Sequence, residues 1–511
     1  MNLFKNVITV SFFTGLSRIL GMVREMFLSN ILGASWISDA FVVAFKFPNF
    51  FRRFFAEGAF NAAFVPQFAG TLEKQGKEQA YILAQSTFSV MFFFLSTFCA
   101  LVLIAAPVLI YVIAPGFLDT QEKITLTVTL VRLTFPFIVF VSLSALLAGV
   151  LNSFERFAAA SATPILLNIF MILALLTYGY FDTQPVIALS FSVTLAGLTQ
   201  LLWLYMATRR VGLSLTLTLP VITPAVKKVL RLMIPGAIGA GVMQINLLID
   251  MILASFLASG SISYLYYADR LNQLPLSIFG VAMGTALLPQ LSKLCRLNKR
   301  EEALHIQENA LLMSMQLTVP AAVALFFLAE PLIGLLYGHG QFGHDDVLKT
   351  APALAAFSVG LPAYVTSKIF SATFFAVENT KTPVKIGLIT LVINIILNLV
   401  LMQYYAHVGM ALATSIAAWC NVILMGYYLN KTNLFMFTRR QMGHLVKVII
   451  LSFVMGFLVL ASKKFFVAHH GDFIHMTLLT QIRLMVFLVT IGIGFYISAG
   501  LMMGFSKITK R

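Results

Sequence analysis

Charged residues are scarce in this 511-residue chain: Asp, Glu, Lys and Arg make up 11% of it, whereas 59% of residues are hydrophobic. A soluble domain averages about 25% charged and about 45–50% apolar residues. Acids are the scarcest group, with 19 Asp and Glu against 35 Lys and Arg, and the formal net charge is +16. This composition excludes a soluble globular protein and indicates an all-α polytopic membrane protein.

Cysteine and catalytic motifs are also lacking. The three cysteines, Cys99, Cys295 and Cys420, are too few and too scattered for a disulfide framework or a metal knuckle. The histidine-containing segments 338–346 and 469–475 lack a metal-ligand spacing, so we expect no metal site. No Walker sequence, dinucleotide-binding loop or nucleophile elbow occurs, so we do not expect this chain to hydrolyse ATP.

Apolar runs of about 20 residues predict about fourteen transmembrane helices. They span 6–29, 37–56, 81–113, 124–151, 157–180, 185–207, 228–257, 263–291, 303–337, 350–377, 383–404, 407–429, 443–467 and 476–503. Lys and Arg gather in alternate loops, which predicts that the N-terminus and the C-terminus are both cytoplasmic. Because the positive charge lies in these loops, anionic lipid headgroups are the expected neighbours and nucleic acid is not.

The chain repeats itself in two halves of the same orientation. Pro136 and Asn168 lie at the same spacing as Pro362 and Asn394, and AFVPQF at 63–68 resembles ALLPQL at 286–291. We therefore predict two six-helix lobes in parallel pseudo-repeat, at 1–210 and 211–435, followed by two further helices at 436–511. Transporters built from such repeats bind substrate between the lobes and work by alternating access.

Several charged residues interrupt the apolar runs, where each costs about 2.5–3.5 kcal/mol on insertion scales. Cations outnumber acids among them: Arg18, Arg24, Lys46, Arg52, Arg270 and Lys368 against Glu25, Asp39, Asp250 and Asp269. Internal salt bridges account for some of these cations, and the surplus predicts a water-filled cavity that binds an anion. Arginine is suited to this role because its planar fork matches phosphate oxygens. Arg132 and Arg483 lie nearer the helix ends and are expected to be structural.

Three segments carry a family resemblance. SRILGMVRE at 17–25, DAFVVAFKFPNFFRRFFAEGAFNAAFVP at 39–66 and SYLYYADRLNQLPLSIFGVAMGTALLPQLS at 263–292 resemble the MurJ (MviN) family of lipid II flippases, within the MOP exporter superfamily. The resemblance covers essentially the whole chain. It implies that Arg18, Arg24, Arg52 and Arg270 bind substrate, and that Asp39, Glu57, Ser263 and Asp269 act in gating or cavity polarity.

The resemblance also implies a function: moving the undecaprenyl-diphosphate-linked peptidoglycan precursor, lipid II, from the cytoplasmic to the periplasmic leaflet of a bacterial inner membrane. The last two helices would then hold the lipid tail in a groove, and cell-wall synthesis proteins would be the partners. No cofactor is expected. The family is linked to sodium, and surplus cations suit coupling to the membrane potential, but the sequence identifies no sodium site. Two alternatives stay open: a flippase for another polyprenyl-diphosphate-linked oligosaccharide, and a MATE-like multidrug antiporter.

Overall fold

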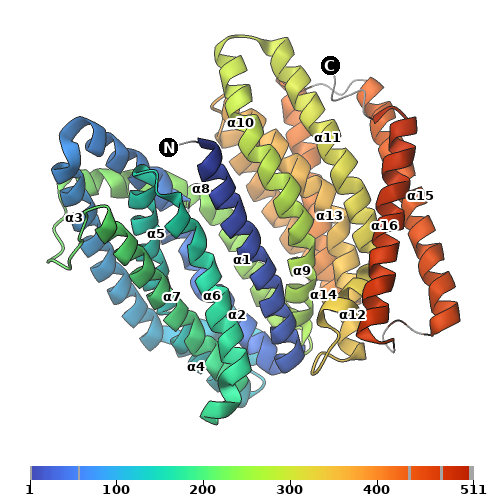
Figure 1. Ribbon diagram of the computed structural model, residues 1–511, viewed down its shortest axis with the longest axis horizontal. Coiled ribbons are helices and arrows are strands. Elements are labelled where there is room, and N and C mark those ends of the chain that lie inside the picture. The colour runs from blue at the N-terminus through green and yellow to red at the C-terminus, as the bar shows by residue number, and fades with distance from the viewer. Residues whose placement is uncertain (1–2, 56–57, 436–438, 472, 474–475, 506–511) are drawn as a thin grey trace. The chain divides into compact units, whose positions relative to one another are not determined.

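The chain is mostly helical and has no strands in the residues that the computed structural model describes: 3–55, 58–435, 439–471, 473 and 476–505 (Figure 1). It divides into two compact units, Met1–Gly260 and Ser261–Arg511. The division follows packing, whereas the lobes 1–210, 211–435 and 436–511 follow the internal repeat, so these lobes stay a prediction. The segment that separates the two schemes is 211–260, which packs in the first unit.

The first unit is a bundle of eight α-helices with two short 3₁₀ turns, η1 (Pro115–Phe117) and η2 (Tyr178–Phe181). The helices are α1 (Leu3–Leu32), α2 (Trp36–Phe55), α3 (Ala59–Ile113), α4 (Gln121–Thr134), α5 (Phe137–Ser153), α6 (Phe157–Thr177), α7 (Pro185–Arg210) and α8 (Pro224–Ser255). Helix α6 packs on α1 and α7, α5 on α3 and α7, and α8 along α3. The α1–α6 contact positions the candidate site of this unit.

The second unit is built around α13 (His344–Ala376), which packs against helices on several sides. The other elements are α9 (Ser261–Pro275), η3 (Leu276–Gly280), α10 (Val281–Arg296), α11 (Arg300–Phe327), α12 (Ala329–Tyr337), α14 (Lys381–Lys431), α15 (Arg439–His470) and α16 (Leu478–Met502). Helices α9, α10, α11 and α14 all contact α13. Its buried face includes Leu361, Ile369 and Phe370, which are inaccessible to solvent.

The helices agree in position with the predicted membrane spans. Within the described residues, each of the fourteen predicted ranges falls mainly on helix. Two long helices contain a kink where the chain turns, at Gly76 in α3 and at Ala406 in α14. In the described residues, nine helical segments are long and apolar enough to cross a membrane by length and composition. The polytopic all-α prediction is confirmed, and the count of fourteen stays a prediction.

Two interruptions of the helices lie at or next to prolines. The chain leaves α4 at Thr134 and re-enters α5 at Phe137, so Pro136 stands in the break, where its missing N–H cannot disturb a helical ladder. The repeat-related Pro362 instead remains inside α13. Between α9 and α10, after Pro275, lies a π-helical turn at Leu276–Gly280. Such turns are often found at functional sites.

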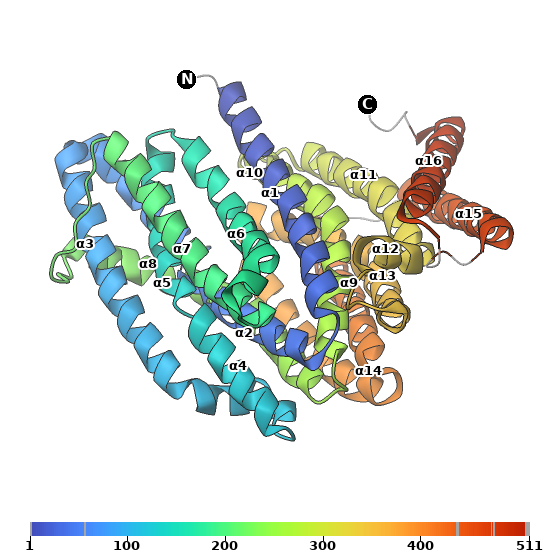
Figure 2. The same cartoon turned by 60° about the horizontal axis from the view of Figure 1, so that its bottom comes forward.

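An extended segment, residues 211–223, joins α7 to α8 and lies beside α3 (Figure 2). Gly212 turns the chain out of α7 with a φ of 81°, and a Cβ there would approach Lys77 Nζ to 2.7 Å. The backbone conformation favours glycine here, whereas the flexible end of the Lys77 side chain could move aside. Leu213 and Leu215 are buried, whereas Leu217 and Leu219 are exposed.

Polar contacts attach the two C-terminal helices to the second unit. Gln316 on α11 lies 2.7 Å from His444 on α15 between their side-chain nitrogens, and Tyr496 on α16 donates to the Gln316 carbonyl over 2.9 Å. Because lipid is as apolar as a leucine side chain, hydrogen bonds and close packing hold membrane helices together. The pair α15–α16 is thus a packed part of the second unit.

Candidate functional site

Arg24 on α1 is the most enclosed of the predicted arginines, with 7% of its surface exposed. Its Nη2 forms an ion pair with Glu25, which is 3% exposed, and Nη1 donates to Asn168 Oδ1 over 3.0 Å. The guanidinium also lies 5.8 Å from the centre of the Phe45 ring on α2. This buried charge is therefore compensated within its own unit, which is the salt-bridged alternative considered for some of the cations.

Asn168 on α6 fixes this arginine. Besides accepting from Arg24, its Nδ2 donates to the Ser17 carbonyl on α1 over 2.9 Å, so one amide joins two turns of α1 to α6. Gly21 faces the same amide, and a Cβ there would make an ordinary contact with Asn168 Nδ2 at 3.7 Å. The sequence marked Asn168 only as a repeat position, and its polar side chain within an apolar run was the signal for this role.

The other predicted cations of the first unit are more accessible. Arg18 on α1 and Lys46 on α2 are exposed, and Arg52 on α2 is half-buried. Arg18 and Arg24 are six residues apart on one continuous helix, which separates them by about 9 Å along the axis. Helix α1 thus carries two arginines at different heights, the buried Arg24 and the exposed Arg18.

Asp39 near the start of α2 is buried, with 1% exposed, and its Oδ2 accepts a hydrogen bond from the Gly260 backbone N–H over 2.7 Å. Gly260 has a φ of 92° and ends the loop after α8. Asp39 therefore fastens the end of the first unit to α2. Glu57, the other acid expected in gating, lies outside the described residues.

In the second unit, Arg270 on α9 is half-buried and stacks on its own helix. Its Cζ lies 4.8 Å from the centre of the Tyr266 ring, and Nη2 donates to the Tyr266 hydroxyl over 3.1 Å. Asp269 accepts from Gln273 one turn later, and Ser263 is fully buried. Tyr266 was not expected at the site, although its spacing of four residues from Arg270 places both on one helix face.

The remaining charged residues in the predicted spans have simpler surroundings. Asp250 on α8 accepts from Asn246 over 3.1 Å, and Lys368 on α13 is exposed. Arg132 is exposed and its Nε donates to the Leu103 carbonyl on α3 over 3.2 Å, a structural contact as expected. Arg483 on α16 is exposed.

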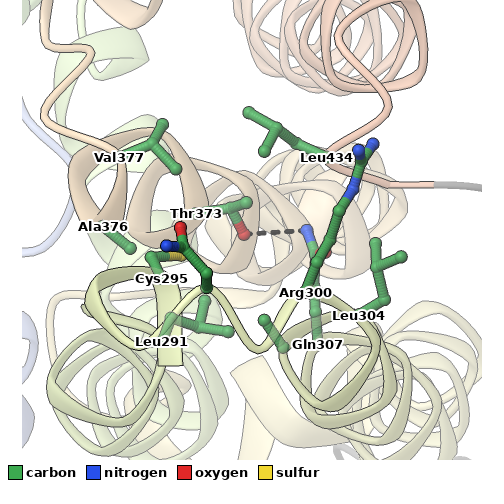
Figure 3. Close-up of a pocket in the computed structure, with 11 residues that line it drawn as sticks. Leu291, Cys295, Arg300, Leu304, Gln307, Thr373, Ala376, Val377 and Leu434 are labelled. Carbon is green, nitrogen blue, oxygen red and sulfur yellow. Dashed lines mark hydrogen bonds between the residues drawn. The ribbon is translucent and has the colours of Figure 1, made fainter. Parts of the chain in front are cut away.

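A cavity of about 280 Å³ lies in the second unit at the ends of α10, α11 and α13 (Figure 3). Apolar side chains such as Leu291 and Leu304 line it, and Gln307 donates to Thr373 over 2.7 Å at its wall. Cys295 also lines it, and burial raises the pKa of this thiol. None of the residues expected at the substrate site lines this cavity.

The arginines of the described residues suit the binding of a ligand. Each unit presents arginine on a helix beside aromatic rings, which suits an oxyanion such as phosphate. No cluster of three or more potential metal-ligating side chains occurs in the part of the chain that the structure describes. A helical membrane protein with two packed units and arginines within its apolar helices belongs to the class of polytopic membrane transporters.

Comparison with known proteins identifies the family. The family model described as lipid II flippase MurJ matches residues 28–481. Curated relatives include a probable lipid II flippase MurJ from Rhizobium tropici, 43% identical over 83% of this chain and 80% of the relative, and one from Rickettsia prowazekii, 40% identical over 84% of each. The lipid II flippase MurJ of Burkholderia cenocepacia is 35% identical over 85% of each chain. This chain belongs to the MurJ family.

Solved structures agree. A lipid II flippase MurJ in an inward closed conformation matches with a TM-score of 0.80 at 27% identity, over 97% of this chain and 98% of that one. A multidrug resistance MATE family transporter of the MOP superfamily, in an inward-facing conformation, matches with a TM-score of 0.69 at 15% identity, over 82% of this chain and 95% of that one. The second likeness concerns the fold alone.

Proposed function

We propose that this chain is a flippase that moves lipid II from the cytoplasmic to the periplasmic leaflet of a bacterial inner membrane by alternating access. The observation that carries the proposal is the match to the MurJ family over residues 28–481. Nothing is cleaved or joined in this process, so the chain acts as a transporter and not as an enzyme. The N-terminus and C-terminus are both cytoplasmic in this proposal, in accord with the Lys and Arg of the loops.

The diphosphate of the substrate is the ligand of the arginines in this proposal. Arg18, Arg24 and Arg52 act from the first unit and Arg270 acts from the second. Guanidinium groups suit this ligand because they bind phosphate oxygens in pairs. Asp39, Glu57, Ser263 and Asp269 act in gating or in cavity polarity, and the buried Asp39–Gly260 contact supports such a role for Asp39.

The charge balance separates this function from a multidrug cation antiporter. A cation carrier needs acidic side chains at its site, whereas here Glu25 pairs with Arg24 and Asp269 binds Gln273. A flippase for another polyprenyl-diphosphate-linked oligosaccharide would share the arginines and differ in the sugar contacts. The energy source in this proposal is the membrane potential, worth about 2.3 kcal/mol per charge per 100 mV, or a sodium gradient.

Helices α15 and α16 hold the polyprenyl tail in this proposal. Phe453 and Phe457 on α15 are exposed side chains at a spacing of four residues, on one apolar face. Replacing both with Asn should slow flipping of lipid II while leaving the amount of protein in the membrane unchanged. If flipping is unaffected, the tail does not use this face.

Depletion of the protein tests the function itself. Lipid II should accumulate in the cytoplasmic leaflet, out of reach of an externally added probe for its headgroup, and the cells should lyse. Re-expression of the wild-type chain should restore access within the same culture. Accumulation of another polyprenyl-diphosphate-linked oligosaccharide, with lipid II fully accessible, would establish the alternative flippase instead.

A further inference from the structure

The extended segment 211–223 is held on α3 by a ladder of side-chain contacts. Lys77 Nζ donates to the Val211 carbonyl over 2.8 Å, and the Tyr81 hydroxyl donates to the Ser214 carbonyl over 2.9 Å. Gln85 Oε1 accepts from the Thr216 N–H over 2.9 Å. Ser89 Oγ accepts from the Thr218 N–H over 3.2 Å. Four side chains of a helix thus take the place of a neighbouring β-strand.

The two partners have matching repeats. Four residues of helix rise by about 6 Å, and two residues of extended chain span about 6.6 Å. From Tyr81 onward each step of four along α3 therefore meets a step of two along the segment, as the Ser214, Thr216 and Thr218 contacts confirm. This matching gives hydrogen-bond partners to backbone groups of the segment that face α3.

The sequence of the segment repeats with the same period. LSLTLTL at 213–219 alternates leucine with Ser or Thr. A shift by two residues therefore replaces each side chain with one of the same kind on the same face, whereas a shift by one residue would exchange the two faces. Leu213 and Leu215 are each 2% exposed, whereas Leu217 is 55% exposed and available to take the place of Leu215.

We propose that residues 211–223 form a sliding strap with two registers on α3, two residues apart, and that the slip moves the start of α8 by about one helical turn during transport. In the second register, Thr216 faces Tyr81, Thr218 faces Gln85, and Leu217 is buried where Leu215 lies now. Pro220 has no N–H to offer Ser89, so that register has one hydrogen bond fewer and is the less populated. Turn-sized shifts between two packed positions are a known form of conformational switching.

The end of the strap next to α7 can absorb the slip. The shift toward Lys77 leaves two extra residues between Arg210 and the first contact with Tyr81, and these form a bulge around Gly212. Glycine tolerates the changed backbone angles that a bulge needs. Helix α7 itself need not unwind.

Cysteine pairs that share one position distinguish the registers. In full-length chain with Cys99, Cys295 and Cys420 replaced by Ala, Ser89→Cys with Thr218→Cys reports the observed register, because the two hydroxyl oxygens are 3.0 Å apart. Gln85→Cys with Thr218→Cys reports the slipped one. In the observed register Thr218 lies at Ser89, one helical turn of α3 from position 85, so this pair is brought together by the slip. Tyr81→Cys with Thr218→Cys fits neither register and is the control.

In lipid nanodiscs under mild oxidation, the first pair should form a disulfide most rapidly. The second should form one at least tenfold faster than the control pair. If the second pair is no faster than the control, the strap has one register and the proposal is wrong. Formation of the disulfide is read by mass spectrometry, so this result does not depend on the proposed transport function.

Two matched substitutions sharpen the result. Leu217→Asn places an amide at an exposed position now and at a buried position after the slip, so it should abolish the second disulfide and keep the first. Leu219→Asn makes the same chemical change at a side chain that stays on the exposed side in both registers, so both disulfides should persist. Equal loss of the second disulfide in both variants would contradict the proposed burial of Leu217.

The following measurement of transport rests on the proposed function. Oxidation of the Ser89→Cys/Thr218→Cys pair should reduce lipid II flipping more than tenfold, and a reductant should restore it. Wild-type flipping by the fully oxidised protein would mean that the strap is static during transport, which overturns the proposed role of the slip. That outcome leaves the flippase function intact, so the two failures are distinguishable.

Discussion

Arg24 in the first unit and Arg270 in the second have opposite surroundings. Arg24 is sealed between α1, α2 and α6, paired with Glu25 and fixed by Asn168. Arg270 is half-buried and stacks on Tyr266 of its own helix. Removing one partner of a buried ion pair leaves the other charge buried. Removing an accessible arginine that stacks on an aromatic ring does not. Similar effects on transport at the two positions should therefore come with very different effects on folding.

Cysteine follows the same division. Cys99 in the first unit is 6% exposed, whereas Cys295 in the second is half-buried and lines a cavity. At the positions compared, the first unit encloses its polar groups and the second leaves them within reach of solvent or ligand.

The largest expected effect is that of Arg24→Ala, which should abolish flipping and lower the free energy of unfolding by about 3–5 kcal/mol, because a buried ion pair is broken and the Glu25 charge loses its arginine partner. The double variant Arg24→Ala/Glu25→Gln removes that charge and should recover most of the stability without recovering transport. Stability is measured by denaturation in detergent, and flipping in reconstituted vesicles. Wild-type flipping by the double variant would reduce Arg24 to a structural residue.

The repeat-related asparagines provide the next comparison. Asn168→Ala loses a hydrogen bond to a charged group and should lower the free energy of unfolding by about 1.5–3 kcal/mol. Asn394, 3% exposed on α14, accepts from Asn398 over 3.1 Å, while its Nδ2 has no partner among the described residues. Asn394→Ala removes one neutral bond together with that unsatisfied N–H, and should cost under about 1.5 kcal/mol. Equal losses of unfolding free energy in the two variants would show that Asn168 and Asn394 contribute equally to stability, contrary to this prediction.

These contrasts mark what the sequence could and could not predict. Length and hydropathy were enough to place the helices, because membrane-spanning segments must be long, apolar and internally hydrogen-bonded. The presence of arginine within the apolar runs was equally plain. Whether an arginine is sealed or accessible was not, because it depends on residues distant in sequence, such as Asn168 for Arg24. The strap on α3 was also missed, since the LSLTLTL alternation appears as a loop until its partner helix is known.

A smaller effect is expected from Arg270→Lys. Lysine keeps the charge but loses the planar fork, so flipping should fall about tenfold while the amount of folded protein stays normal, because the site is accessible. Arg132→Lys is the control, since Arg132 is exposed and bonds only one neutral carbonyl among the contacts described. It should flip lipid II at the wild-type rate. If Lys supports flipping as well as Arg at both position 270 and position 24, positive potential alone suffices. The proposed paired binding of phosphate oxygens by guanidinium groups is then wrong.

The smallest effect concerns the thiols. The thiolate is the reactive form, and burial raises the pKa of Cys295 above the ordinary value of 9.0, so its reaction with a maleimide at pH 7 should be slower than that of an exposed cysteine. Below this raised pKa the thiolate fraction, and with it the labelling rate, should rise about tenfold per pH unit between pH 7 and 8. Cys99 should remain unlabelled in the folded protein, and a Cys295→Ala variant identifies the labelled site by mass spectrometry. A Cys295 labelling rate that is flat across this range, or labelling of Cys99 at the same rate, would remove the contrast between the enclosed Cys99 and the more accessible Cys295.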